Sequence, residues 1–335
     1  MVHPGEKEIV VTAQAFWIAK PGDGEIRPVE VPEPGPGEVL VRTLHSGVSR
    51  GTETLVFRGG VPASQHAAMR APFQEGDFPA PVKYGYLNVG VVEQGPAELV
   101  GRTVFCLYPH QTHYVVPAEA VTVVPENVPA RRAVLAGTVE TALNALWDAA
   151  PLIGDRITVV GAGMIGASVA ATLARFPATR VQLVDANPER ALLAARLGVD
   201  FALPPDAAGD RDLVVHASAT SEGLTRSLEL LATEGTVVEL SWYGDRQVSV
   251  PLGEFFHSRR LVIKSSQVGG IAPARRDRRT YADRLATALD LLEDPIFDAL
   301  LTGESDFAAL PAVMPRLTSG ELPALCHLIT YETGE

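Results

Sequence analysis

The six residues from 161 to 166 form the clearest chemical motif in the sequence. They read Gly-Ala-Gly-Met-Ile-Gly and fit the pattern G-x-G-x-x-G. In this pattern Gly161 permits a tight turn, Gly163 lets the backbone approach a pyrophosphate, and Gly166 lets a helix pack closely on a strand. The helix that follows presents amide N–H groups and partial positive charge at its N-terminus. The motif predicts a dinucleotide site, with Met164 and Ile165 as further binding residues of the same turn.

A carboxylate at the end of the next predicted strand favours one type of dinucleotide. Asp185 stands where a side chain accepts hydrogen bonds from the ribose hydroxyls of adenosine. A carboxylate there repels a 2′-phosphate, so we expect NAD rather than NADP. Arg190 is close enough in sequence to soften this preference, unless it is simply a solvated helix residue. Ser218 and Ser241, which end two later strand-like runs, are further candidate cofactor-binding residues.

The pattern around the motif predicts the elements that position it. Buried strand-like runs alternate with helix-like runs from about residue 157 onward. This alternation is typical of a parallel, doubly wound α/β sheet. The predicted strands are 157–160, 181–185, 212–218, 235–241 and 260–266, and the predicted helices are 166–175, 189–198, 223–232 and 251–258.

The first third of the chain follows a different pattern. Runs rich in β-branched residues, such as 9–20 and 38–49, lie between Pro/Gly clusters and predict an irregular all-β domain. One long helix is expected at 130–149. A helix at 279–293 and a strand at 325–331 are expected to return to the first domain. The predicted divisions are therefore 1–128, 129–270 and 271–335.

Composition excludes several classes of function. The chain has 335 residues, and 40 acidic against 28 basic residues give a net charge of −12. This acidic surplus repels phosphate backbones and argues against a nucleic-acid partner. The sequence lacks an apolar run of 18 residues, and residues 1–8 lack the apolar core of a signal peptide. We expect a cytoplasmic protein that acts on a small molecule and has no membrane partner.

The whole chain resembles the medium-chain dehydrogenase/reductase superfamily, whose members are alcohol dehydrogenase-like. The stretches that carry the resemblance are PGPGEVLVRTLHSGVSRGTE (34–53), VKYGYLNVGVVEQG (82–95), VVPAEAVTVVPENV (115–128), TALNAL (141–146) and the glycine turn. The resemblance implies a Rossmann sheet inserted in a β-rich, GroES-like catalytic domain. The segments SRGTE, KYGY and FHSRRLVIKSSQ (256–267) are most similar to the bacteriochlorophyllide dehydrogenase-like branch.

The zinc positions of the superfamily are changed in this sequence. Ser49 and Arg50 match the segment of the ligating cysteine, and Gly85-Tyr86-Leu87 matches the Gly-His-Glu motif. The third ligand position falls near Ala133. The cysteine-rich structural lobe has no counterpart, because Cys106 and Cys326 are the only cysteines. Zinc needs three or four converging ligands, so we expect neither catalytic nor structural zinc.

Hydride transfer without zinc requires another group to polarise the carbonyl oxygen. The resemblance places Tyr86 where the zinc-ligating histidine stands, so its phenol is the candidate hydrogen-bond donor. Lys83 is the candidate that lowers the pKa of Tyr86 or binds the substrate. The structural alternatives are a tyrosine ring that fills the empty zinc cavity and a solvated loop lysine.

Four other residues are weaker candidates. The resemblance places Glu53 beside the metal site and Glu140 and Thr138 on the nicotinamide side. His110 is a candidate proton relay because its ordinary pKa is near neutrality. The alternatives are a turn-stabilising role for Glu53, a buried and satisfied histidine, and a paired helix residue at Glu140. His216 and His257 are expected to be structural.

Together these features predict a zinc-independent, NAD(H)-dependent alcohol dehydrogenase or ketone reductase. One alternative is the conjugate reduction of a C=C or C=N bond, as in quinone and enoyl reductases. The other is a non-catalytic NAD-binding protein. By resemblance we expect a homodimer formed through the last Rossmann strand, near 260–266.

Overall fold

The computed structural model describes residues 9–332 and divides the chain into two compact units. The first unit comprises Met1–Gly137 and Leu301–Glu335, and the second comprises Thr138–Leu300. The polar segment 1–8, on which the expectation of no signal peptide depends, lies outside the described residues. Among residues 9–332, no helix is long and apolar enough to cross a membrane.

The first unit is built on two mainly antiparallel sheets. The smaller has the order β2-β1-β5-β4, and the larger has the order β16-β17-β3-β6-β7-β9 with β8 also paired to β3. The strands are β1 (Ile9–Lys20), β2 (Asp23–Pro32), β3 (Glu38–Ser49), β4 (Glu75–Gly76), β5 (Val82–Lys83), β6 (Asn88–Gln94), β7 (Thr103–Cys106), β8 (His113–Pro117), β9 (Val121–Val123), β16 (Leu301–Asp306) and β17 (Cys326–Thr330). Apolar side chains from β3, β6, β7 and β8 form its core.

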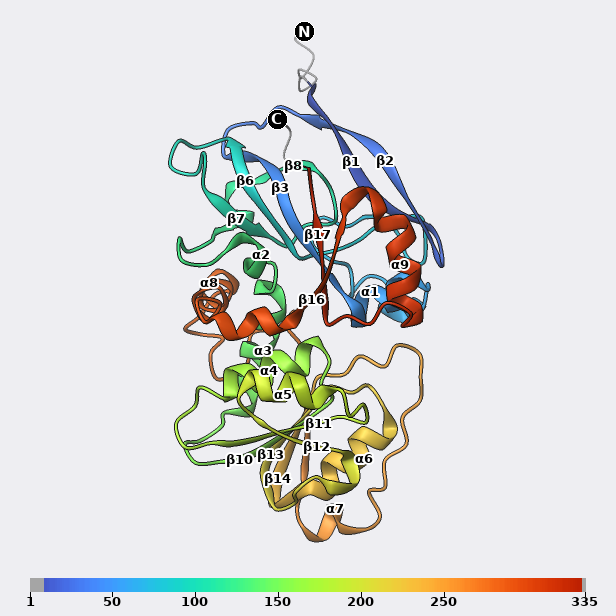
Figure 1. Ribbon diagram of the computed structural model, residues 1–335, viewed down its shortest axis with the longest axis vertical. Helices are drawn as coiled ribbons and strands as arrows, with labels where there is room; N and C mark the ends of the chain where they lie inside the picture. Colours follow the sequence, from blue (N-terminus) through green and yellow to red (C-terminus); the bar gives the residue numbers. More distant parts are fainter. Residues whose placement is uncertain (1–8, 333–335) are drawn as a thin grey trace. The chain divides into compact units, whose positions relative to one another are not determined.

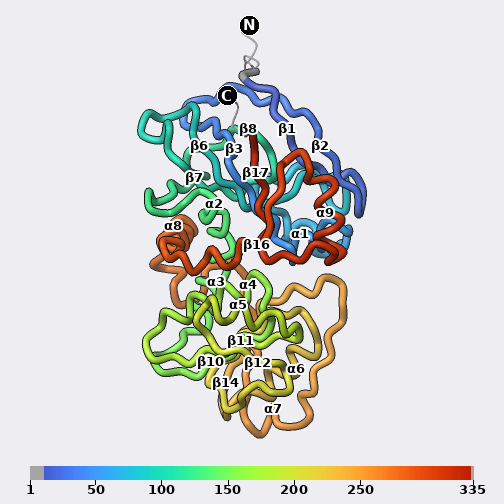
Figure 2. The backbone as a smooth tube through the Cα atoms, in the orientation of Figure 1, coloured from blue at the N-terminus to red at the C-terminus, as the bar shows by residue number. Residues whose placement is uncertain are grey.

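The end of the chain completes this larger sheet. Strand β17 lies beside β3 (Figure 2). The two strands are antiparallel, with Cys326 opposite Ser49 and Thr330 opposite His45. The helices of the unit are α1 (Arg50–Phe57), α2 (Ala130–Ala133) and α9 (Leu310–Ser319). The sequence did not predict α1, because the β-rich pattern around it suggested an all-β first third.

The second unit contains a six-stranded parallel sheet with the order β12-β11-β10-β13-β14-β15. Strands β10 to β14 are labelled in Figure 1. Its strands are β10 (Arg156–Val160), β11 (Arg180–Val184), β12 (Asp200–Ala202), β13 (Arg211–His216), β14 (Leu231–Glu239) and β15 (Val262–Ser265). Numbered within the unit, this is the 3-2-1-4-5-6 order of dinucleotide-binding sheets. The predicted doubly wound α/β sheet is confirmed.

Helices cover the parallel sheet because its strands are apolar on both faces. Ile157, Thr158 and Val159 of β10 are completely buried, as expected for a central parallel strand. Helix α4 packs on β10 and β11, and α6 packs on β13 and β14. The helices are α3 (Ala136–Ala149), α4 (Met164–Leu173), α5 (Arg190–Leu197), α6 (Ser221–Leu230), α7 (Phe255–Ser258) and α8 (Tyr281–Leu291).

The structure divides the chain at other positions than the sequence pattern suggested. The helix expected at 130–149 is broken into α2 and α3, and the first boundary falls near the start of α3. Helix α8 belongs to the second unit, so only residues from Leu301 onward return to the first. The reason is that α8 buries Arg284, Leu285 and Leu289, and Arg284 is bonded to α3.

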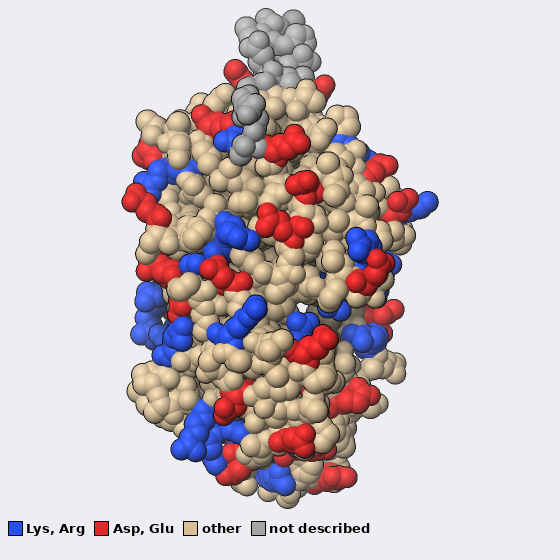
Figure 3. All heavy atoms as spheres, viewed as in Figure 1, with Lys and Arg blue, Asp and Glu red and all other residues tan. Residues whose placement is uncertain are grey.

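On the face shown in Figure 3, acidic and basic side chains are interspersed.

Candidate functional site

The three glycines of the turn meet three different steric demands. Gly161 has a φ of +104°, and a Cβ added there would lie 2.7 Å from the backbone nitrogen of Ser218. A Cβ on Gly166 would lie 1.9 Å from the carbonyl oxygen of Gly161, so α4 packs directly on the turn. A Cβ on Gly163 would meet no atom within 4 Å. The turn therefore presents an open backbone surface at the N-terminus of α4, and this surface fits a pyrophosphate.

Asp185 braces the glycine turn. One carboxylate oxygen accepts a hydrogen bond from the backbone N–H of Ala162 at 2.7 Å, and the other accepts from Asn187 at 2.8 Å. Each oxygen keeps a lone pair for a further donor. Thr138 is buried and donates to the sulfur of Met164 at 3.7 Å, so α3 reaches the turn from another side. Arg190 is the half-buried first residue of α5.

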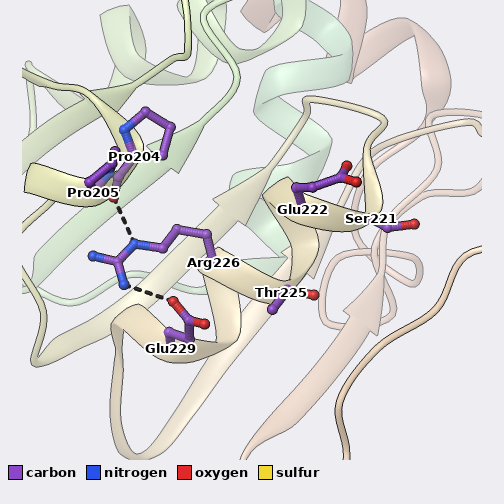
Figure 4. A pocket seen from close by; sticks show the side chains of 7 residues that line it. All are labelled: Pro204, Pro205, Ser221, Glu222, Thr225, Arg226 and Glu229. Carbon is purple, nitrogen blue, oxygen red and sulfur yellow. Dashed lines mark hydrogen bonds and ion pairs between the residues drawn. The ribbon is translucent and has the colours of Figure 1, made fainter.

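A pocket of about 450 Å³ lies between the segment after β12 and the start of α6 (Figure 4). Arg226 donates to the carbonyl oxygen of Pro204 at 2.8 Å and pairs with Glu229 at 2.7 Å. Its guanidinium is therefore already neutralised. The lining residues are Pro204, Pro205, Ser221, Glu222, Thr225, Arg226 and Glu229. Because they follow β12 and β13, the pocket is at the carboxyl edge of the sheet, where such folds bind ligands.

A buried chain of polar side chains crosses the first unit. Nε2 of His110 is 2.9 Å from a carboxylate oxygen of Glu53, and Nδ1 of His110 is 2.7 Å from the hydroxyl of Ser46. The Ser46 hydroxyl is 2.8 Å from that of Tyr331. The other oxygen of Glu53 accepts the backbone N–H of Ser49 at 2.7 Å. Every member thus has a partner, as a buried polar chain requires.

Tyr86 lies beside this chain. Its half-buried ring makes an edge-on contact with Tyr84, with centroids 5.9 Å apart. Burial and the Glu53 carboxylate raise the pKa of Tyr86 well above 10, and contacts with Ser49 and Thr52 lower it only in part. The phenol therefore keeps its proton at neutral pH. Ser49 and Thr52, rather than Lys83, are the groups that lower its pKa.

Lys83 is occupied by other partners. Its side chain is 0% exposed, and its ammonium is 2.5 Å from Glu75 and 2.7 Å from the side-chain oxygen of Gln111. Burial lowers the pKa of Lys83, while Glu75 opposes the shift. The ammonium also lies 5.4 Å from the centre of the Tyr108 ring. Lys83 is therefore neither a solvated loop residue nor the modifier of Tyr86 that the sequence suggested.

Glu140 is also paired. Its carboxylate is 3.0 Å from Nε of Arg284, and both side chains are buried. Arg284 further donates to Asn144 at 2.7 Å and to the carbonyl oxygen of Val268 at 2.6 Å. Glu140 is therefore the paired helix residue that the sequence left as an alternative, because its carboxylate already holds a cation from α8. The sequence did not point to Arg284, because its pattern suggested that the helix carrying this residue belongs to the other domain.

The donors around Tyr86 do not fit a zinc ion. Within residues 9–332, no group of three or more His, Cys, Asp or Glu side chains could hold a metal. Glu53 and His110 are bonded to each other and to Ser49 and Ser46.

The structure brings Ser218 and Ser241 into one polar cluster at the ends of β13 and β14. Ser218 contacts His216, and the Ser241 backbone N–H donates to Glu239 at 2.7 Å. The sequence did not predict Ser46, Tyr331 and Glu239 as members of these clusters. They lie far along the chain from their partners, and only the register of the strands brings them together.

Comparison with known proteins identifies the fold. No protein-family model matches the chain. An uncharacterised zinc-type alcohol dehydrogenase-like protein of Haemophilus influenzae is 27% identical over 51% of this chain and 51% of its own length. An L-threonine 3-dehydrogenase of Sinorhizobium medicae is 26% identical over 60% of this chain and 64% of its own length. The matches thus span about half to two thirds of these relatives.

Solved structures match nearly the whole chain. An Escherichia coli enzyme described as a short chain alcohol dehydrogenase, complexed with NADH, has a TM-score of 0.76 and 18% identity, covering 96% of this chain and 100% of the other. The 2R,3R-butanediol dehydrogenase of Bacillus subtilis has a TM-score of 0.77 and 18% identity, covering 95% and 99%. A zinc-binding dehydrogenase from Sinorhizobium meliloti, bound to NADP, has a TM-score of 0.75 and 17% identity, covering 96% and 100%. The predicted fold, a Rossmann sheet inserted in a GroES-like unit, is confirmed.

Proposed function

We propose that the protein is a zinc-lacking oxidoreductase of the medium-chain dehydrogenase type. In this proposal it transfers a hydride between a nicotinamide dinucleotide and a secondary alcohol or the corresponding ketone. The observation that carries it is the glycine turn, whose open backbone surface lies at the carboxyl edge of a 3-2-1-4-5-6 sheet. The dehydrogenases with the same fold support the reaction class.

The residues of the second unit suit a dinucleotide. The open side of Gly163 and the first amides of α4 would hold the pyrophosphate, and Asp185 would accept the adenosine ribose hydroxyls. The pocket beside α6 would take the adenine. When bound, the cofactor supplies or accepts the hydride. NAD is favoured over NADP, because Asp185 would repel a 2′-phosphate and Arg226 is already paired with Glu229.

Tyr86 is our candidate for the role that zinc plays in related enzymes. Its protonated phenol would donate a hydrogen bond to the carbonyl oxygen and stabilise the negative charge that develops there. During reduction the carbonyl carbon would receive the hydride of the bound cofactor and the oxygen would receive the Tyr86 proton. The hydroxyls of Ser49 and Thr52 contact the phenol and would relay a proton from solvent to it.

Glu53 and His110 are positioning residues in this proposal. Glu53 holds the Ser49 backbone, and His110 holds Glu53 from the other side. After burial, the Glu53 carboxylate is the next cause that raises the pKa of Tyr86, because its negative charge opposes ionisation of the phenol. The pair would therefore fix the Ser49 backbone beside the donor.

A second proposal concerns the edge of the parallel sheet. Strand β15 is the last strand of that sheet, and Val262 and Ile263 on it are 46% and 36% exposed. An exposed apolar edge strand favours pairing with another strand. We propose that two copies of the chain pair along β15, and sedimentation of the wild type and Val262→Lys tests it. A wild-type dimer and a variant monomer are expected, and a wild-type monomer would reject the proposal.

The hydride-transfer proposal is tested by binding and turnover together. Calorimetry with NADH and NADPH should detect binding, with NADH the tighter ligand. Oxidation of butane-2,3-diol and L-threonine should then be followed as NADH formation, with and without a zinc chelator. Turnover that survives the chelator is expected. Failure to bind either cofactor would reject the proposal, and turnover that depends on added zinc would reject the role of Tyr86.

A further inference from the structure

A second histidine–carboxylate pair lies in the parallel-sheet unit and has no part in the steps described above. His216 ends β13 and Glu239 ends β14, directly opposite each other in the sheet. Nδ1 of the buried His216 is 2.7 Å from a carboxylate oxygen of Glu239, and Nε2 is 2.7 Å from the hydroxyl of Ser218. The Tyr243 hydroxyl donates to the same carboxylate oxygen at 3.0 Å. The pair thus links the ends of two neighbouring strands to Ser218.

The hydrogen-bond directions in this cluster are set by its members. Burial alone would raise the pKa of Glu239, but His216 and Ser241 bring it below its usual value, so the carboxylate is ionised and only accepts. Nδ1 of His216 must therefore carry a hydrogen. With one proton on the ring, Nε2 accepts the hydrogen of the Ser218 hydroxyl.

Thr220 completes the orientation of Ser218. The oxygen of the Thr220 hydroxyl accepts the backbone N–H of Gly223 at 3.0 Å, and it is 2.9 Å from the Ser218 oxygen. Its own hydrogen can therefore point to Ser218. The hydrogen of the Ser218 hydroxyl points to Nε2 of His216, and one lone pair of its oxygen accepts the Thr220 hydrogen. The Ser218 oxygen therefore keeps a single lone pair for a ligand.

A glycine in the first turn of helix α6 leaves room for the cluster. A Cβ on Gly223, in the first turn of α6, would lie 2.1 Å from the Ser218 oxygen and 2.8 Å from Nε2 of His216. Glycine costs an exposed helix about 1 kcal/mol relative to alanine, yet here a larger residue would push Ser218 off His216. The close approach of these side chains therefore depends on the glycine.

The position of Ser218 indicates what it faces. Its backbone touches Gly161, the first glycine of the turn. Asp185 follows β11 on one side of the central strand β10, whereas β13 and β14 lie on the other side. A dinucleotide whose adenosine is held at Asp185 must carry its other half over the ends of β13 and β14. A dinucleotide bound in this way would bring its nicotinamide ribose to this cluster.

We propose that Ser218 binds a hydroxyl of the nicotinamide ribose and that His216 and Glu239 are positioning residues that fix the Ser218 hydroxyl as the acceptor. This inference rests on the proposed function, since the ligand is a nicotinamide dinucleotide. The ribose hydroxyl donates its hydrogen to the remaining lone pair of Ser218. ADP lacks this ribose, so ADP does not contact Ser218 by this bond.

The difference between NADH and ADP provides the test. Calorimetry should give dissociation constants of both ligands for the wild type, Ser218→Ala and His216→Gln. We expect both variants to bind NADH roughly 3- to 12-fold more weakly, the loss of about one hydrogen bond. ADP binding should stay within about twofold of the wild type, which also shows that the variants are folded. His257→Gln is the matched control, because His257 is exposed and should change neither constant.

The outcomes separate this inference from the proposed function. Unchanged NADH binding in Ser218→Ala, or equal weakening of NADH and ADP in both variants, would overturn the role of the cluster and leave the cofactor intact. A wild-type protein that binds neither ligand would overturn both proposals. A loss confined to NADH would support the cluster.

Discussion

Replacing Arg284 with methionine should strongly destabilise the second unit. Arg284 is 2% exposed, and its guanidinium holds Glu140, Asn144 and the loop at Val268. Removing one partner of a buried ion pair costs about 3–5 kcal/mol. Each kcal/mol lowers the Tm of a unit of this size by about 2–4 °C, so Arg284→Met should lower Tm by roughly 6–20 °C.

The loss should depend on pH in a defined direction. Burial raises the pKa of Glu140 and Arg284 lowers it, so without Arg284 the pKa rises further. In the variant, the pKa of Glu140 is higher in the folded state than in the unfolded state. Between these two pKa values the folded state binds more protons, so the free energy of unfolding falls as pH rises. Differential scanning calorimetry should therefore show a larger deficit at pH 8 than at pH 5.

A matched control separates the ion pair from the loss of charge alone. Arg278 is exposed and lies near α8, so Arg278→Met should leave Tm almost unchanged. If Arg284→Met behaved like Arg278→Met, or if its deficit were the same at pH 5 and pH 8, the buried pair would not be the cause and our interpretation of Glu140 would be wrong.

Three further changes test other parts of the structure. Gly163→Val should weaken NADH binding by about tenfold or more without lowering Tm, because the valine side chain enters the open space where the pyrophosphate would bind. Gly166→Ala should instead lower Tm, because the added methyl group forces α4 off the turn. Equal losses of Tm in the two variants would contradict this geometry. Asp185→Asn removes a charge that repels the 2′-phosphate, so the ratio of the NADH and NADPH dissociation constants, measured by calorimetry, should shift by about tenfold in favour of NADPH. An unchanged ratio would show that the adenosine ribose does not bind at Asp185. Burial lowers the pKa of Lys83 below its usual 10.5, so between the folded-state and unfolded-state pKa the unfolded protein binds more protons and the stability of the wild type rises with pH. The Tm of Lys83→Met relative to the wild type should therefore fall as pH rises toward 10.5. A constant difference in Tm would show that the lysine pKa is unshifted.

The sequence predicted those features that depend on neighbouring residues. The turn from Gly161 to Gly166 combines a local motif with a strand before it and a helix after it, and the structure reproduces all three steric demands. The alternation of strands and helices likewise led to the correct parallel sheet. Where the pattern was weak, as at α1, a helix was missed.

The sequence did not predict contacts between residues distant in the chain. Glu140 and Arg284 meet only because α8 stays in the second unit, and Ser46 reaches Tyr331 only because β17 pairs with β3. Lys83 was assigned to Tyr86 from their spacing, but in a strand the register decides the partner. Its real partner, Glu75, comes from the neighbouring strand β4.

The most direct test of the central claim is the turnover of butane-2,3-diol with NAD by protein that has been dialysed against a zinc chelator, in the wild type and in Tyr86→Phe. The change removes one hydroxyl and leaves the ring that contacts Tyr84. We predict that the chelated wild type remains active and that Tyr86→Phe lowers kcat by about 10²-fold or more, as expected for the loss of one oxyanion donor. A chelated wild type that regains activity only with added zinc, or a Tyr86→Phe variant with unchanged kcat, would contradict the account.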